Sequence, residues 1–110
     1  MIARIWHGRT LAGQANAYLE YINQTGVPDY RQTPGNLGVF VFRQIKGTEA
    51  HFLTLSLWDS YESIRRFAGD EYQFAKYYPE DEQYLLEFEP NVQHYEVSTS
   101  FFGGFVPCQK

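Results

Sequence analysis

The chain contains almost no cysteine. Cys108 is the single cysteine among 110 residues, so an intramolecular disulfide is excluded, and a reducing, cytoplasmic setting is the expectation. The sequence also lacks any apolar run near the roughly 20 residues that a membrane span requires. Because the N-terminus shows no charged region followed by an apolar stretch, we expect no signal peptide. These absences predict a protein without a membrane partner.

Basic residues and the sequence motifs of common catalytic sites are also scarce. Nine Lys and Arg stand against 13 Asp and Glu, and the net charge of −4 argues against nucleic acid, whose binding depends on cations that neutralise phosphates. The chain has no HExxH, CxxC or GxSxG motif and no glycine-rich phosphate loop. His7, His51 and His94 fall on three different predicted strands without the close spacing of metal ligands, so no metal site is expected.

Aromatic residues, by contrast, are abundant. Nine Tyr and nine Phe contribute to an aromatic share of 18%, and 44% of the residues are apolar. This composition predicts one folded domain with one core, and it suggests more buried surface than a two-layer monomer needs. We assign residues 1–97 to the domain and residues 98–110 to an aromatic tail. Phe101, Phe102 and Phe105 are costly to expose, so we expect the tail to dock on the domain or on a dimer partner.

Four segments show the patterns of β-strands. Residues 2–7 alternate between two faces with a period of two, and the glycine that follows is expected to end the strand. Residues 36–44 and 50–58 are rich in β-forming side chains and flank a turn at 46–48, which predicts a hairpin. Residues 92–97 form the last predicted strand.

A first helix is expected between the first two strands, over residues 11–22. Thr10 is its predicted cap, and Gly26 and Pro28 are its predicted stop signals. The residues from Pro28 to the next strand are expected to form a polar loop.

A second helix is expected to begin with a cap at Asp59 and to end at Gly69. Its apolar stripe runs through Ile64 and Phe67. Residues 72–78 are predicted to form a further short helical stretch before the last strand. The resulting order, β-α-β-β-α-β, is that of a ferredoxin-like α+β domain with an antiparallel sheet. Its helices cover one sheet face, so the other face must be covered by a partner, a ligand or solvent.

His7 is the main candidate for a catalytic group. It shares a strand face with Ala3 and Ile5, which are apolar and are expected to point inward. One interpretation is a histidine at a strand end that is partly exposed or bonded to the backbone. The other is a polar group at the mouth of an apolar pocket, the usual place of an orienting or proton-transferring residue. His94 is interpreted as a sheet residue at an interface between sheets.

Large aromatic side chains supply the candidate substrate-binding residues. The set comprises Trp58, Phe67, Phe74, Tyr77 and Tyr78. Such residues are most often packed into a core. The alternative is an aromatic-lined cavity between the helices and the sheet, suited to a flat hydrophobic ligand. The sequence leaves both interpretations open.

Five motifs together are similar to those of a known family. They are MIARIWHGRT (1–10), SLWDS (56–60), SIRRFAG (63–69), YYP (77–79) and VQHYEV (92–97). In this order they resemble the antibiotic biosynthesis monooxygenase domain family over almost the whole chain before the tail. The resemblance implies a dimeric α+β barrel, in which two ferredoxin-like sheets close face to face in a homodimer.

The family includes cofactor-independent oxygenases of aromatic polyketides and haem-degrading enzymes. Haem degraders carry an Asn on the first strand, a Trp in the second helical region and a His further along. This chain has His7, Phe67 and a residue near Tyr77 at those points. Because the expected axial ligand of haem iron is missing, haem degradation is disfavoured and no cofactor is expected.

The resemblance therefore implies a monooxygenase that oxidises a small aromatic or quinol-like molecule. His7 would be the catalytic base or hydrogen-bonding group, and the aromatic set named above would shape the substrate pocket. The alternative is a non-catalytic dimeric barrel that binds a small hydrophobic ligand or a protein. A closed pocket with His7 and a second polar group inside favours chemistry, and a filled core favours the alternative.

Overall fold

The computed structural model describes residues 1–101, which form an α+β domain around a four-stranded antiparallel sheet. The strand order is β2-β3-β1-β4, and each adjacent pair is antiparallel. The strands are β1 (Ile2–Leu11), β2 (Asn36–Lys46), β3 (Glu49–Trp58) and β4 (Gln93–Glu96). This topology confirms the predicted ferredoxin-like fold class.

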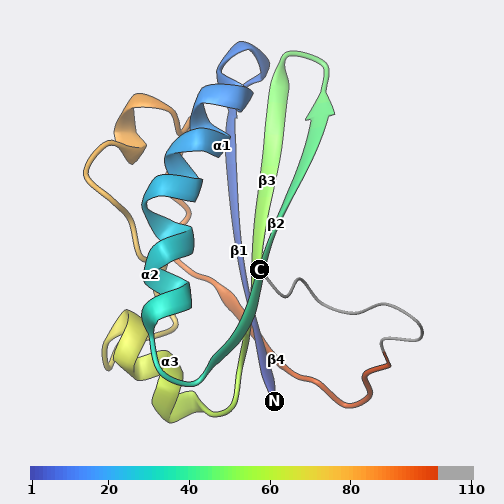
Figure 1. Ribbon diagram of the computed structural model, residues 1–110. Coiled ribbons are helices and arrows are strands. Elements are labelled where there is room, and N and C mark those ends of the chain that lie inside the picture. The colour runs from blue at the N-terminus through green and yellow to red at the C-terminus, as the bar shows by residue number, and fades with distance from the viewer. Residues whose placement is uncertain (102–110) are drawn as a thin grey trace.

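The three α-helices lie on one face of the sheet (Figure 1). They are α1 (Ala15–Gln24), α2 (Gly26–Gln32) and α3 (Tyr61–Ala68), and the short 3-10 helices are η1 (Ala12–Gln14) and η2 (Asp81–Gln83). Within residues 1–101 no helix covers the opposite face (Figure 1), which we call the open face.

The core lies between the sheet and the helices. Alternate residues of β1 and β3 point to this side, so Trp6, Phe52 and Trp58 are buried. They belong to two packed clusters, one against α1 and one against α3. Ile64 and Phe67 supply the α3 side of the second cluster, which confirms the predicted apolar stripe.

β1 is longer than predicted and continues through Gly8 to Leu11. Gly8 is required inside the strand because the Trp6 ring lies over it. A β-carbon at this position would stand 2.4 Å from the ring carbon Cη2. Thr10 is a fully buried strand residue opposite Ala50, so its predicted role as a helix cap was wrong. The pairing of β1 with β3 along its whole length explains the difference.

The segment after α1 is a second helix rather than the predicted polar loop. α2 begins at Gly26 and includes Pro28 in its first turn. Proline is tolerated there because the first amide groups of a helix have no intrahelical acceptor. Gly26 and Pro28 therefore mark the start of α2 instead of ending the helix before it.

α3 is capped one residue later than predicted. Its N-cap is Ser60, whose Oγ accepts a hydrogen bond from the Ser63 amide at 3.3 Å. Asp59 supports the same turn, since its Oδ1 accepts a hydrogen bond from the Ser63 hydroxyl at 2.5 Å. The helix ends at Gly69 as predicted, where φ is 89°.

Residues 72–78 are not helical, contrary to the sequence prediction. The buried Arg4 of β1 donates hydrogen bonds to the Tyr72 carbonyl at 2.5 Å and to the Phe74 carbonyl at 3.2 Å. In a helix these carbonyls would accept from amides four residues later. Hydrogen bonds to a distant strand therefore replace the helical ones.

The predicted tail falls mostly outside the described residues. Phe101 is 89% exposed, whereas Phe102, Phe105 and Cys108 lie beyond the part of the chain that the structure describes. Within residues 1–101, none of the helices has the length and apolar character that crossing a membrane requires.

Candidate functional site

The open face changes from apolar to polar along the strands. Cross-strand register places its apolar side chains in adjacent rows, formed by Ala3, Ile5, Phe40, Phe42, Leu53, Leu55 and Leu57. The next row is polar, because Arg9 of β1 lies opposite His51 of β3. His7 stands at the boundary between the two regions.

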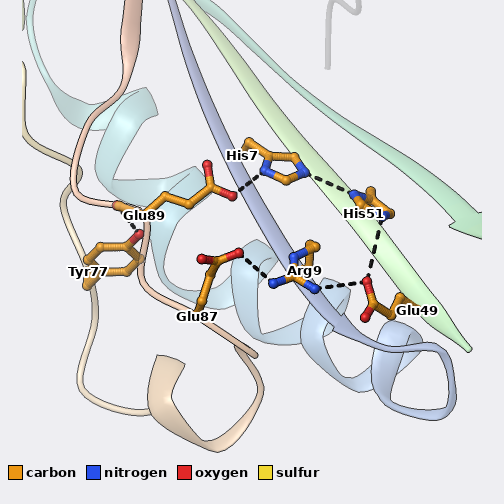
Figure 2. Close-up of polar contacts among 7 residues, drawn as sticks. All are labelled: His7, Arg9, Glu49, His51, Tyr77, Glu87 and Glu89. Atoms are coloured by element: carbon orange, nitrogen blue, oxygen red, sulfur yellow. Dashed lines mark hydrogen bonds and ion pairs between the residues drawn. The ribbon is translucent and has the colours of Figure 1, made fainter.

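His7 is held between a carboxylate and a second histidine (Figure 2). Its Nδ1 lies 2.5 Å from Glu89 Oε2, and its Nε2 lies 3.0 Å from His51 Nδ1. The two imidazole rings are stacked, with centroids 5.3 Å apart. A carboxylate only accepts hydrogen bonds, so His7 donates from Nδ1 to Glu89. The structure thus places a hydrogen-bonded imidazole pair at the edge of an apolar surface.

Arg9 connects this cluster to two further carboxylates (Figure 2). Its guanidinium donates to Glu87 at 2.5 Å and to Glu49 at 3.0 Å. These two hydrogen bonds raise the pKa of Arg9, so it remains a cation. Glu49 also faces the histidines, since its Oε1 lies 3.9 Å from His51 Nε2.

Glu87 and Glu89 come from the segment 84–92, which leads from η2 to β4 (Figure 2). β4 pairs with only the first half of β1, so the rest of that strand edge is available to this segment. The Leu86 amide donates to the Arg9 carbonyl at 2.9 Å. This contact holds the segment beside β1 and brings both carboxylates to the open face.

A hollow of about 340 Å³ lies on the open face beside the two histidines. Its volume falls in the range of small-molecule sites, which is about 300–1,000 Å³. Its lining residues are His7, Phe42, Arg43, Gln44, His51 and Leu53. An apolar wall with a few convergent polar groups is the usual composition of such a site.

Trp58 and Phe67 are buried on the helix side of the sheet, whereas His7 lies on the open face. Phe67 stacks on Tyr30, with ring centroids 4.4 Å apart, and its centroid lies 5.6 Å from that of Trp58. The Trp58 indole donates to Ser56 Oγ at 2.9 Å. The structure does not bring these two aromatic residues together with His7, and their role in substrate binding stays a prediction.

Phe74 and Tyr77 lie in the segment after α3. Phe74 is half exposed, and its backbone pairs with Asn91. Tyr77 packs edge-on against Trp6 and donates its hydroxyl to the Glu89 carbonyl at 2.5 Å (Figure 2). Of the two, Tyr77 supports the His7 cluster through the backbone of its acidic partner.

Tyr78 holds α2 against the same segment. Its hydroxyl donates to Asp29 Oδ2 at 2.6 Å, and burial raises the pKa of Tyr78. Burial alone would raise the pKa of Asp29, but hydrogen bonds from Lys76 and Tyr78 outweigh it and lower that pKa. Tyr78 therefore makes a structural contact away from His7, and its predicted substrate contact is untested.

The interior on the helix side is filled. The hollow found there has a volume of about 30 Å³, far below the roughly 300 Å³ at which small-molecule sites begin. It lies among Trp6, Tyr18, Tyr30 and Asp81. Burial raises the pKa of Asp81, which accepts a hydrogen bond from the Tyr18 hydroxyl at 3.1 Å. This packing favours the core interpretation of the aromatic residues over an open cavity between helices and sheet.

Arg4 is a buried cation with no carboxylate partner among residues 1–101. Its guanidinium lies over the Phe67 ring and 3.2 Å from His94 Nε2. Burial and the Arg4 charge lower the pKa of His94 to about 4, so this imidazole is neutral near pH 7. His94 therefore faces the helix side rather than an interface between sheets, and with Arg4 it ties β4 to β1.

His51 and Glu89 are the members of the cluster that sequence reasoning missed. They lie 44 and 82 residues from His7, so sequence spacing gives no sign of their contact. One signal was available for His51, because it alternates in phase with Leu53 and Leu55 on the open side of β3. Glu89 carries no comparable signal, since its position depends on the path of an irregular segment.

Comparisons with known proteins establish the fold. The sequence matches no protein-family model, and no curated protein matches it either. A variant of MhuD with two manganese protoporphyrin IX molecules per active site has a TM-score of 0.61 at 20% identity, covering 94% of this chain and 100% of that chain. The haem degrader MhuD of Mycobacterium tuberculosis, with two haems in its active site, has a TM-score of 0.58 at 19% identity, with coverages of 92% and 99%.

A Bacillus cereus protein named as an antibiotic biosynthesis monooxygenase is similar to the same extent. Its TM-score is 0.60 at 16% identity, and the match covers 91% of this chain and 95% of that chain. At such identities the likeness shows the fold alone. The chain therefore has the fold of antibiotic biosynthesis monooxygenase domains, as the sequence resemblance implies.

Proposed function

We propose that the protein is a cofactor-independent monooxygenase that oxidises a small hydroxylated aromatic molecule in the open-face hollow. The observation that carries this proposal is the 2.5 Å contact between His7 and Glu89 at a hollow of about 340 Å³. An imidazole oriented by a carboxylate is suited to general-base catalysis. Phe42 and Leu53 offer an apolar wall to a flat ring. The fold shared with a protein named as a monooxygenase supports this class of reaction.

The chemistry begins when a phenol proton passes to the hydrogen-bonded imidazole pair of His7 and His51. The resulting phenolate is electron-rich and reduces O₂ by one electron, and the two radicals combine to a hydroperoxide at a ring carbon. Loss of water then gives a quinone. One oxygen atom becomes the new carbonyl, and the other leaves as water with the phenol hydrogen and the ring hydrogen. The phenol supplies all four electrons, so no further reductant is needed.

We propose that a second copy of the chain covers the open face. Phe40, Phe42 and Leu53 are between 39% and 48% exposed there, and an apolar patch of this kind marks an association site. A two-fold axis would set the open faces of two sheets against each other. The hollow would then be shielded from water, which strengthens the electrostatic effect of the histidine and its carboxylate.

Oxygen uptake tests the proposed reaction. Chelator-treated protein should consume O₂ with at least one member of a panel of hydroxylated aromatics, without added flavin or nicotinamide. His7→Ala should lower the turnover at least about tenfold, because general-base catalysis typically contributes about 10²–10⁴-fold. His94→Gln is the matched control and should retain activity. Absence of uptake across the panel contradicts the proposed function, and full activity of His7→Ala contradicts the role of His7.

A second candidate function is a non-catalytic dimeric barrel that binds a small hydrophobic ligand. The filled helix side, with its hollow of about 30 Å³, favours this candidate. A thermal-shift screen with hydroxylated aromatics and haem would find such ligands. Recovery of a bound aromatic unchanged after exposure to air supports the binding function, whereas its conversion to a quinone contradicts it.

A further inference from the structure

We infer that Glu89, His7 and His51 form a proton relay in which His51 Nε2 receives the substrate proton and His7 stores it beside Glu89. The inference rests on the proposed oxidation and deepens it. In this relay His51 is the group that contacts the substrate, and Glu89 is a positioning residue that orients His7. It also gives the proton a direction, from the hollow toward the segment 84–92.

The direction follows from the order of donors and acceptors. Glu89 accepts from His7 Nδ1, so the lone pair of neutral His7 is on Nε2. That lone pair lies 3.0 Å from His51 Nδ1, which must therefore carry a hydrogen. Neutral His51 is left with its lone pair on Nε2. The carboxylate thus fixes the tautomer of a ring that it does not touch.

His51 Nε2 is well placed to receive a proton from a bound phenol. The His51 side chain is 29% exposed and lines the hollow together with Phe42 and Leu53. On its own strand Glu49 lies 3.9 Å from Nε2, but the carboxylate of Glu49 is engaged by Arg9 at 3.0 Å. The Nε2 lone pair is therefore available to a ligand.

The transfer conserves protons and charge. Arrival of the phenol proton at His51 Nε2 releases the Nδ1 proton of His51 to His7 Nε2. His51 is then neutral again in its other tautomer, and His7 is an imidazolium beside the Glu89 carboxylate. Such a charge-assisted pair is stronger than a neutral hydrogen bond. The positive charge on His7 balances the phenolate that remains in the hollow.

Ring-nitrogen NMR of the full chain tests the relay without substrate. In the neutral wild type, both His7 and His51 should carry their hydrogen on Nδ1. Glu89→Met removes the acceptor while keeping the side-chain length, so the ring signals of both histidines should move, although Glu89 does not contact His51. Glu87→Met removes a carboxylate from the same segment and should leave both sets of signals in place. Unchanged His94 signals would show that each variant is folded.

Two results would overturn the relay on this measurement. One is a wild-type His7 with its hydrogen on Nε2. The other is a Glu89→Met variant in which the His51 signals stay at their wild-type positions while those of His7 move.

Turnover separates a failure of the relay from a failure of the proposed oxidation. His51→Gln should lower kcat at least about tenfold and leave KM nearly unchanged, because glutamine preserves the polar wall but is not a base. Wild-type kcat in His51→Gln overturns the relay and leaves the oxidation standing. Correct tautomers in a protein that oxidises no phenol overturn the oxidation, and with it the role of His51 toward a substrate.

Discussion

The two faces of this sheet differ in how completely their side chains are buried. On the helix side, Trp58 is fully buried, Phe67 stacks on Tyr30 and packs against Trp58, and the hollow there is about 30 Å³. On the open side, Phe42 is 48% exposed beside a hollow of about 340 Å³. The same strands thus provide stability on one face and a surface for binding on the other.

The two faces also differ in the groups that bind their arginine side chains. Arg4 on the helix side is bound by backbone carbonyls and by a neutral imidazole, with no carboxylate near it in residues 1–101. Arg9 on the open side contacts Glu49 and Glu87, next to two histidines. His94, the imidazole beside Arg4, has a pKa of about 4 and stays neutral near pH 7, whereas the open-face cluster combines two histidines with several carboxylates. This contrast explains why the proton chemistry is proposed for the open face.

Truncation of one phenylalanine on each face measures the difference in packing. Phe67→Ala should lower the free energy of unfolding by about 3–5 kcal/mol, because it leaves a cavity among buried rings. Phe42→Ala should cost about 1 kcal/mol within the chain, since half of this side chain is already in water. Urea denaturation measures both values. Equal losses that do not depend on protein concentration would remove the distinction between the faces.

A charge introduced on each face tests which face associates. Leu55→Glu places a carboxylate in the apolar rows of the open face and should weaken the proposed dimer at least tenfold, roughly 1.4 kcal/mol. Ile45→Glu is the matched control, because Ile45 is 51% exposed and pairs with Ala50 on the other face. Sedimentation of the two variants and the wild type gives the result. A wild type that stays monomeric at micromolar concentration contradicts the dimer.

Acid titration of stability tests His94, the half-buried histidine on the helix side. His94 has a pKa of about 4 in the folded chain, against 6.5 for an ordinary histidine in the unfolded chain. Between these values the unfolded chain binds a proton that the folded chain does not, so stability should fall as the pH drops from 6.5 to 4. His94→Gln keeps an acceptor for Arg4 and should reduce this fall by about 1–3 kcal/mol. An identical pH dependence in the variant would contradict the assignment.

Local sequence patterns predicted the fold well wherever the structure depends on neighbours in the chain. The period of two in β1 correctly predicted a strand with two distinct faces, and the apolar stripe of α3 correctly predicted that Ile64 and Phe67 meet the core. The predicted helix at 72–78 was wrong because Arg4 binds the carbonyls of Tyr72 and Phe74 from about 70 residues away. The prediction that Pro28 ends a helix was wrong for a different reason, since proline can lie in the first turn of a helix or follow the end of one.

The candidate site could be predicted only in part. The alternation of β1 correctly grouped His7 with Ala3 and Ile5 on one face. Its partners depend on the register of β1 against β3 and on the course of the segment 84–92, neither of which a single sequence specifies. The contacts of His51 and Glu89 with His7 are therefore non-local and could not be predicted from the sequence.

The shortness of β4 has a consequence for how this site can change over time. Strand register fixes the two histidines, but the acid beside them is carried by an irregular segment that replaces the missing half of β4. Insertions or deletions in such a segment leave the register of β1 on β3 intact. A lineage can therefore exchange the acid, move it or lose it while inheriting the same scaffold, so that chemistry and architecture evolve as separable traits.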